Sequence, residues 1–264
     1  MNFLEKILYL DTLVRLTRPI LFMKKIFNKD KCKLFNDYEN FLKIAEKYKE
    51  IVVVASGPSA KNIKYDKNNL YITTNSSYLL LDQGMDFIHI LNDLAYLSKF
   101  MAFGLKQKPL KVYIYAPYTN KNNFGYKVMD NIKKYISNNN NIEIVSQDAN
   151  LEDQGNKVNI FNELNLMNDE FSVKNPGGNS GLMILNFALL LSTRLNKPIS
   201  VYGLDAGEGG RVYADGRVTN KNHIAMRDKH KQIMGQYLEY LNSQNLNYKN
   251  YSYFKGNMLL EEEV

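Results

Sequence analysis

The chain has 264 residues but only one cysteine, Cys32, and no tryptophan. A single thiol cannot form an internal disulfide, which fits a reducing compartment. No group of cysteines and histidines has the spacing of a zinc site. The motifs GxxxxGK(S/T), GxGxxG and Gly-x-Ser-x-Gly are absent, and so is an Asp-x-Asp pair for a divalent ion. These absences weaken the interpretation of the chain as a kinase, a dehydrogenase or a hydrolase.

Positive charge is concentrated at the start of the chain. Of the net charge of +7, residues 1–35 carry +5, through eight lysines and arginines against three acids. Apolar positions in residues 3–16 recur with helical spacing. Charges interrupt this stretch, so we expect neither a signal peptide nor a spanning helix, which needs about 20 mostly apolar residues. We expect residues 1–35 to form a basic amphipathic arm on anionic lipid rather than a nucleic-acid binder. The alternative is a helix packed on the protein itself or on a second subunit.

Apolar stretches of strand length alternate with helical patterns over residues 36–264. This alternation predicts an α/β fold with a doubly wound, mostly parallel Rossmann-like sheet in a single domain. The expected strands are one beginning at Ile51, then 70–74, 87–91, 110–116, 142–145, 199–203 and 248–254, and the expected helices are 36–48, 128–136, 180–195 and 223–241.

The stretch that follows the first apolar run is the most informative. Ile51–Val54 suits a strand buried on both faces, and Ser56-Gly57-Pro58-Ser59 ends it sharply. Glycine lets a backbone approach a ligand closely, and ligands of open α/β sheets bind outside the carboxyl ends of strands. We therefore expect a nucleotide phosphate or ribose at this loop. The alternative is a tight turn between a strand and a helix, without a ligand.

Two further strand ends are polar, Asn75-Ser76-Ser77 and Asn92-Asp93. Neutral amides and hydroxyls at neighbouring strand ends suit a ribose, a base edge or a phosphate. The alternative is that these side chains only form Asx and Ser/Thr turns.

Glycine-rich segments flank the apolar helix expected at 180–195. Residues 175–181 place Ser180 and Gly181 at its start, where free N–H groups and the helix dipole favour an anion. The alternative is an ordinary N-cap at Asn179 or Ser180. Residues 203–210 follow a strand and contain Asp205, so we expect a lid around residues 204–222 or, alternatively, a mobile surface loop.

The three histidines have different surroundings in the sequence. His89 alternates with isoleucines inside a strand and is expected to be structural. His223 and His230 lie near a polar helix, where either could take a proton from a sugar hydroxyl near neutral pH. The alternative for each is a solvated helix histidine.

Taken in order, these motifs resemble the bacterial sialyltransferases of glycosyltransferase family 42, over roughly residues 50–245. The Gly-Asn-Gly-Pro-Ser loop of the family matches residues 55–59, with Ser56 in place of the asparagine, and its second-strand asparagine matches Asn75. Its Thr-Ser-Gly helix start matches residues 179–181, and its Ser-Gly-Ile-Asp loop matches residues 202–205. Of two family tyrosines, the second matches Tyr213 and the first falls on Gly207.

The resemblance implies an inverting, metal-independent glycosyltransferase without a cofactor, on a GT-A-like variant of the Rossmann sheet. It would move sialic acid or a related acidic ulosonate from a CMP donor to a bacterial surface-glycan or glycolipid acceptor, as in lipopolysaccharide or capsule biosynthesis. The enzyme would be cytoplasmic and peripheral on the inner membrane face. A homo-oligomer stays open from the sequence. Tyr213 would steady the leaving phosphate, and His230 or else His223 would be the general base. The expected donor-binding residues are Ser56, Gly57, Pro58, Ser59, Asn75, Asn92, Ser180, Gly181 and Asp205.

Two other functions stay open from the sequence. One is a metal-dependent enzyme similar to pterin diphosphokinases, which share a Gly-Pro-Ser strand loop. The other is a non-enzymatic, membrane-associated protein that binds a nucleotide or a glycan.

Overall fold

The computed structural model describes residues 38–91, 96, 99–116, 142–146, 180–210, 213–216, 218, 231, 234–235, 237–239, 241–243 and 246–256. The basic arm at 1–35 and the helix expected at 128–136 lie outside these residues, as does Cys32. No helix in the described ranges is long and apolar enough to span a membrane.

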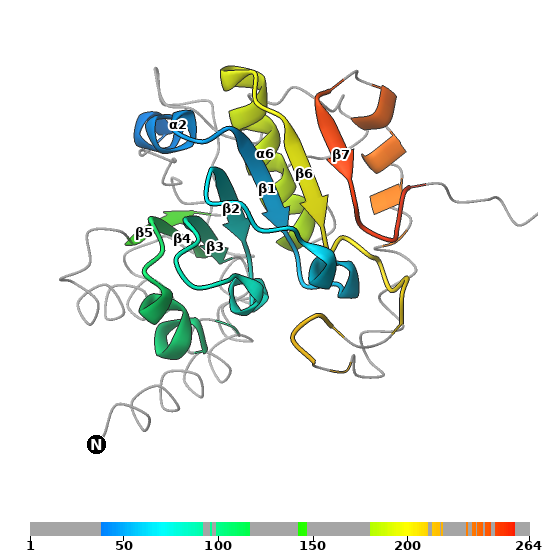
Figure 1. Ribbon diagram of the computed structural model, residues 1–264, viewed down its shortest axis with the longest axis horizontal. Coiled ribbons are helices and arrows are strands. Elements are labelled where there is room, and N and C mark those ends of the chain that lie inside the picture. Colours follow the sequence, from blue (N-terminus) through cyan, green and yellow to red (C-terminus); the bar gives the residue numbers. More distant parts are fainter. Residues whose placement is uncertain are drawn as a thin grey trace, which may run out of the picture.

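Seven strands form one sheet in which all neighbouring strands are parallel. Their order across the sheet is β5-β4-β3-β2-β1-β6-β7 (Figure 1). The strands are β1 (Glu50–Val54), β2 (Asn69–Thr73), β3 (Phe87–Leu91), β4 (Lys111–Ala116), β5 (Ile142–Ser146), β6 (Ile199–Tyr202) and β7 (Tyr248–Asn250). The predicted α/β fold with a parallel, Rossmann-like sheet is thereby confirmed.

The chain adds strands on both sides of β1. From β1 it moves outward strand by strand to β5, and it then returns to place β6 on the other side of β1. The order therefore reverses between β1 and β6, which makes this pair the topological switch point of the sheet. In open α/β sheets, ligands bind in the crevice outside the carboxyl ends of the strands at this point.

Each face of the sheet carries its own apolar core. Ile51 and Val53 of β1 belong to one core, which includes helices α2 (Tyr38–Glu46) and α6 (Ser180–Leu195). Val52 and Val54 point to the second core. Because both faces are covered, β1 is apolar along its length after Glu50, as expected of a buried parallel strand.

Among the described residues, the second core is covered by short helical segments. They are the 3-10 helices η1 (Pro58–Asn62) and η2 (Ser77–Leu80) and the π-helical η4 (Phe100–Gly104), and the 3-10 helix η5 (Leu105–Gln107) follows η4. Residues 234, 237, 238 and 241, which are helical, pack with α6 in the first core.

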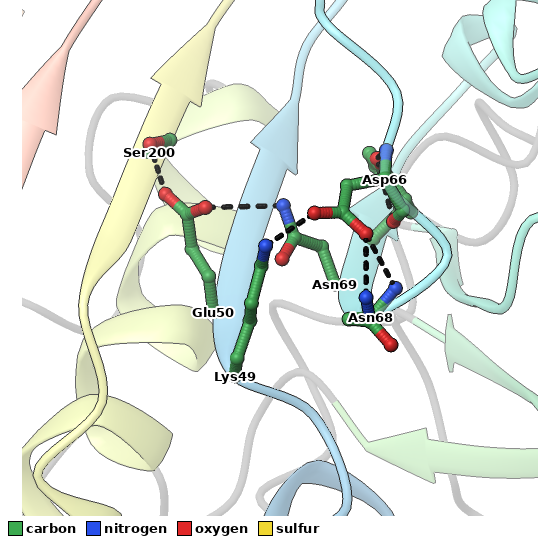
Figure 2. Close-up of polar contacts among 7 residues, drawn as sticks. Lys49, Glu50, Asp66, Asn68, Asn69 and Ser200 are labelled. Carbon is green, nitrogen blue, oxygen red and sulfur yellow. Dashed lines mark hydrogen bonds and ion pairs between the residues drawn. The ribbon is translucent and has the colours of Figure 1, made fainter.

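A polar network fixes the register of three strands at their amino ends. Figure 2 shows the Glu50 carboxylate of β1 between Ser200 of β6 and Asn69 of β2. The Ser200 hydroxyl donates to one Glu50 oxygen, and the Asn69 amide donates to the other at 3.0 Å. The adjacent Lys49 pairs with Asp66. One carboxylate therefore joins β6, β1 and β2, and a shifted strand would lose both bonds.

The predicted strand at 248–254 is wrong in its second half. The ladder ends at Asn250, and the last sheet-like bond runs from the Tyr251 N–H to the Val201 carbonyl. The chain then turns because the Asn250 side chain accepts from the Ser252 N–H at 2.9 Å. The other strands and the helices α2 and α6 lie within a few residues of their predicted positions, whereas the short helical segments η1, η2, η4 and η5 were not predicted.

Candidate functional site

The loop that follows β1 is fastened to the loop that follows β6. Ser59 donates to Asp205 through its N–H at 2.8 Å and through its hydroxyl at 2.6 Å. The Ser59 hydroxyl also accepts from the Gly203 N–H at 2.9 Å, and Asp205 accepts from the Tyr253 N–H at 2.7 Å. Both side chains are buried. Ser59 and Asp205 therefore use their polar atoms within the protein and hold the two loops together.

Two glycines allow this close contact between the loops. A Cβ on Gly57 would lie 2.3 Å from Oδ2 of Asp205 and 2.6 Å from the Gly203 carbonyl oxygen. Gly203 has a φ of +80°, and a Cβ there would lie 2.4 Å from the Ala55 carbonyl oxygen. The absence of a side chain at Gly57 is thus required by the neighbouring loop of the protein itself, independently of any ligand.

Ser56 and Asn75 present polar groups that the described residues leave unused. The Ser56 side chain is half-buried, and its hydroxyl makes no hydrogen bond within the described part of the chain. Asn75 follows β2 with a φ of +54°, a left-handed conformation that asparagine tolerates better than most residues. Its Oδ1 is buried and has no hydrogen-bond partner there. An unpaired buried polar atom is costly, so it marks a position where a ligand or water can supply the partner.

The serines that follow Asn75 have partners. The Ser77 hydroxyl donates to the Val54 carbonyl at 2.5 Å and so ties the end of β2 to the end of β1. The Ser76 hydroxyl donates to Oδ2 of Asp215 at 2.6 Å. Of the predicted polar trio, only Asn75 retains an unpaired buried atom.

Residues 213–216 form a turn that docks on these strand ends. The Gly216 N–H donates to the Tyr213 carbonyl at 2.9 Å, and the Ala214 N–H donates to the Ser56 carbonyl at 3.0 Å. Asp215 has a side chain only 5% exposed, and it also lies 3.7 Å from the Lys99 ammonium group. The turn therefore brings Tyr213, which sequence resemblance singled out, to the edge that carries Ser56 and Asn75.

The N-terminus of helix α6 lies on the same side of the sheet as the carboxyl ends of the strands. It ends at Leu195, shortly before β6 starts at Ile199, so it runs antiparallel to the strands. Figure 1 shows α6 along the face of β1 and β6. Ser180 and Gly181 thus start the helix near the carboxyl ends of the strands.

The loop at 206–210 contacts Lys231 and the segment that follows β7. Glu208 forms an ion pair with Lys231 at 2.6 Å, and its N–H donates to the Asp205 carbonyl at 2.7 Å. Gly209 lies against the Tyr253 ring, where a Cβ would meet the ring at 2.3 Å. The described start of the expected lid is therefore packed on the protein.

Three predicted site residues, Asn92, His223 and His230, lie outside the described residues. His89 is fully buried in β3, as expected of a structural residue. Its Nδ1 lies 2.8 Å from the Thr73 hydroxyl, and its ring stacks on Phe100 at 4.0 Å. Burial lowers the pKa of His89 to about 3. The ring is therefore neutral near physiological pH.

Sequence reasoning missed Asp215, Lys99 and Tyr253. The Asp215-Gly216 pair is a recognisable turn signal, but its contact with Ser76 spans 139 positions and no local pattern reveals it. Within the ranges that the structure describes, no three side chains of His, Cys, Asp or Glu are grouped as a metal site.

Comparisons with protein-family models, with curated proteins and with solved structures gave no match.

Proposed function

We propose that the chain is an inverting glycosyltransferase that uses a CMP-activated acidic sugar without a metal ion. One observation carries the proposal. Oδ1 of Asn75 and the hydroxyl of Ser56, which have no hydrogen-bond partner among the described residues, lie on adjacent strand ends beside the topological switch point. This is where an α/β sheet binds a nucleotide. The order of motifs that resembles family 42 sialyltransferases supports the choice of a CMP donor.

Each residue has a role in this proposal. Ser56, the loop backbone at Gly57 and Pro58, and Asn75 contact the nucleotide. Ser59 and Asp205 hold that loop in place through their mutual hydrogen bonds. Ser180 and the N–H groups at the start of α6 bind the phosphate or the sugar carboxylate.

The reaction is a single displacement. The acceptor hydroxyl oxygen attacks the anomeric carbon, the bond from that carbon to the phosphate oxygen breaks, and CMP leaves with the electron pair. A histidine accepts the hydroxyl proton. Tyr213 donates a hydrogen bond to the leaving phosphate as its negative charge develops. We favour His230 as the base over His223, because it precedes Lys231, which reaches the loop at Glu208.

The test is nucleotide release from a panel of donors. CMP-sialic acid, CMP-Kdo, UDP-sugars and GDP-sugars are each incubated with the protein, with and without EDTA. We expect release of CMP from a CMP-sugar, unchanged by EDTA. Activity with a diphosphate sugar alone, or activity abolished by EDTA, contradicts the proposal. Binding of CMP without turnover of any donor would support a non-enzymatic nucleotide-binding protein instead.

The histidine assignment is tested with two matched variants. His230→Ala is expected to lose nearly all transfer activity, whereas His223→Ala keeps activity close to that of the wild type. If both variants remain active, neither histidine is the base.

A further inference from the structure

A lysine that sequence analysis did not single out lies beside the candidate site. The Lys99 ammonium group is 3.7 Å from Oδ2 of Asp215, and the Lys99 side chain is 37% exposed. The Lys99 backbone is held in place as well, because its carbonyl accepts the Tyr78 hydroxyl at 3.2 Å. Tyr78 is fully buried in the second core, so this bond fixes the base of the lysine to a rigid part of the fold.

The partner of Lys99 belongs to the turn that docks on the strand ends. The carboxylate oxygen of Asp215 that faces Lys99 also accepts from Ser76 at 2.6 Å, and Ser76 follows Asn75 directly. In the same turn, the Ala214 N–H donates to the Ser56 carbonyl. One buried carboxylate thus connects the Lys99 ammonium group to Ser76, the residue after Asn75, and to the turn whose N–H binds the Ser56 carbonyl.

We propose that Lys99 is a binding residue for the phosphate of the ligand. This inference rests on the proposed function. An ammonium group has three N–H donors, and the one contact of this group within the described residues, with Asp215, is longer than a normal hydrogen bond. Lys99 can therefore donate to an anion while Asp215 keeps it oriented. Asp215 acts as a positioning residue through Lys99.

The experiment compares a charged and an uncharged ligand in three variants. Binding of CMP and of cytidine is measured by calorimetry for the wild type, Lys99→Met and Lys99→Arg. Lys106→Met is the matched control, because Lys106 is exposed in η5 and its loss changes the net charge equally. We expect Lys99→Met to weaken CMP binding about tenfold or more, the loss typical of a charge-assisted hydrogen bond. Cytidine binding should stay unchanged, and Lys99→Arg should restore most of the CMP affinity.

Several outcomes overturn the inference. The first is a Lys99→Met variant that binds CMP as the wild type does. The second is a variant that loses affinity for CMP and cytidine equally, as the loss of a purely structural lysine would cause. A loss as large in Lys106→Met would show a general charge effect.

Failure of the proposed function gives a different result. If the wild type binds neither CMP nor cytidine, the nucleotide assignment fails, and inorganic phosphate becomes the probe. Phosphate binding that is lost in Lys99→Met but kept in Lys106→Met supports an anion site without a nucleotide. A wild type that also fails to bind phosphate overturns the inference.

Discussion

At the scale of single residues, Asn75 differs from the polar side chains around it. Ser59, Ser76, Ser77 and Asp205 all have hydrogen-bond partners inside the protein, whereas Oδ1 of Asn75 has none among the described residues. Leaving such an atom unpaired costs on the order of 1–3 kcal/mol. A ligand or a water molecule that donates to Oδ1 of Asn75 would remove this cost.

His89 gives a residue-scale prediction about pH. Burial holds its pKa at about 3 in the folded protein, below the ordinary value of 6.5. The unfolded chain therefore binds a proton as the pH falls below 6.5, while the folded protein does not. Stability is lost over the window from pH 6.5 down to 3. Between pH 6.5 and 5 we expect His89 to cost the protein about 2 kcal/mol of unfolding free energy.

The measurement is urea unfolding of the wild type and His89→Gln at several pH values. Glutamine retains a polar group near Thr73 but does not titrate, so the difference between the two proteins isolates His89. The unfolding free energy of His89→Gln minus that of the wild type should increase as the pH falls. Parallel pH profiles, or an imidazole of His89 that titrates near pH 6.5 by NMR in the folded protein, would show that the ring is not held neutral.

At the scale of elements, Asp205 joins three segments that are distant in sequence. Its carboxylate accepts two hydrogen bonds from Ser59, in the loop after β1, and one from Tyr253, after β7. In Asp205→Asn an amide group replaces one acceptor oxygen and faces a donor. We expect this variant to lose about 3 kcal/mol of unfolding free energy, since it leaves a buried N–H unpaired and removes a charged acceptor.

Chemical denaturation measures this loss, with Glu208→Gln as the control. Glu208 lies in the same loop and pairs with Lys231, but both side chains are partly exposed. Exposed ion pairs contribute less than about 1 kcal/mol, so the control should unfold close to the wild type. Equal stability of the Asp205 variant and the control would mean that the Asp205 contacts do not hold the loops together.

The strands could be predicted from the sequence because of how parallel sheets are covered. A strand with an apolar core on each face, such as β1, must be apolar along its length, and that run is visible without a structure. The short helices η1 and η2 leave no such signal, because 3-10 segments of four or five residues are too short for periodicity.

The candidate site was only partly predictable for a related reason. Residue type and position at a strand end indicated Ser56 and Asn75. The partners of a side chain come from distant segments, as in the bond between Ser59 and Asp205 across 146 positions. Sequence patterns therefore could not reveal that Asp205 binds the loop after β1 through Ser59. Nor could they reveal that Asp215 contacts both Lys99 and Ser76.

At the scale of the whole molecule, the order of the strands determines where the candidate site lies. The strand order reverses between β1 and β6, and their loops are joined by Asp205 at the carboxyl edge. The opposite edge is joined by Glu50 to Ser200 and Asn69, in a network that fixes register (Figure 2). The fold thus places the network that fixes strand register at the amino ends of the strands, and Ser56 and Asn75 at the carboxyl ends.

Hydrogen–deuterium exchange of the wild-type chain, with and without saturating CMP, tests this assignment most directly. Bound CMP should slow exchange of backbone N–H groups in residues 55–59, 74–77 and 213–216, which lie at the carboxyl edge. Exchange in residues 66–69, at the opposite edge, should not change. Protection confined to other segments, or no protection at any CMP concentration, would contradict a nucleotide site at the carboxyl ends of β1 and β2.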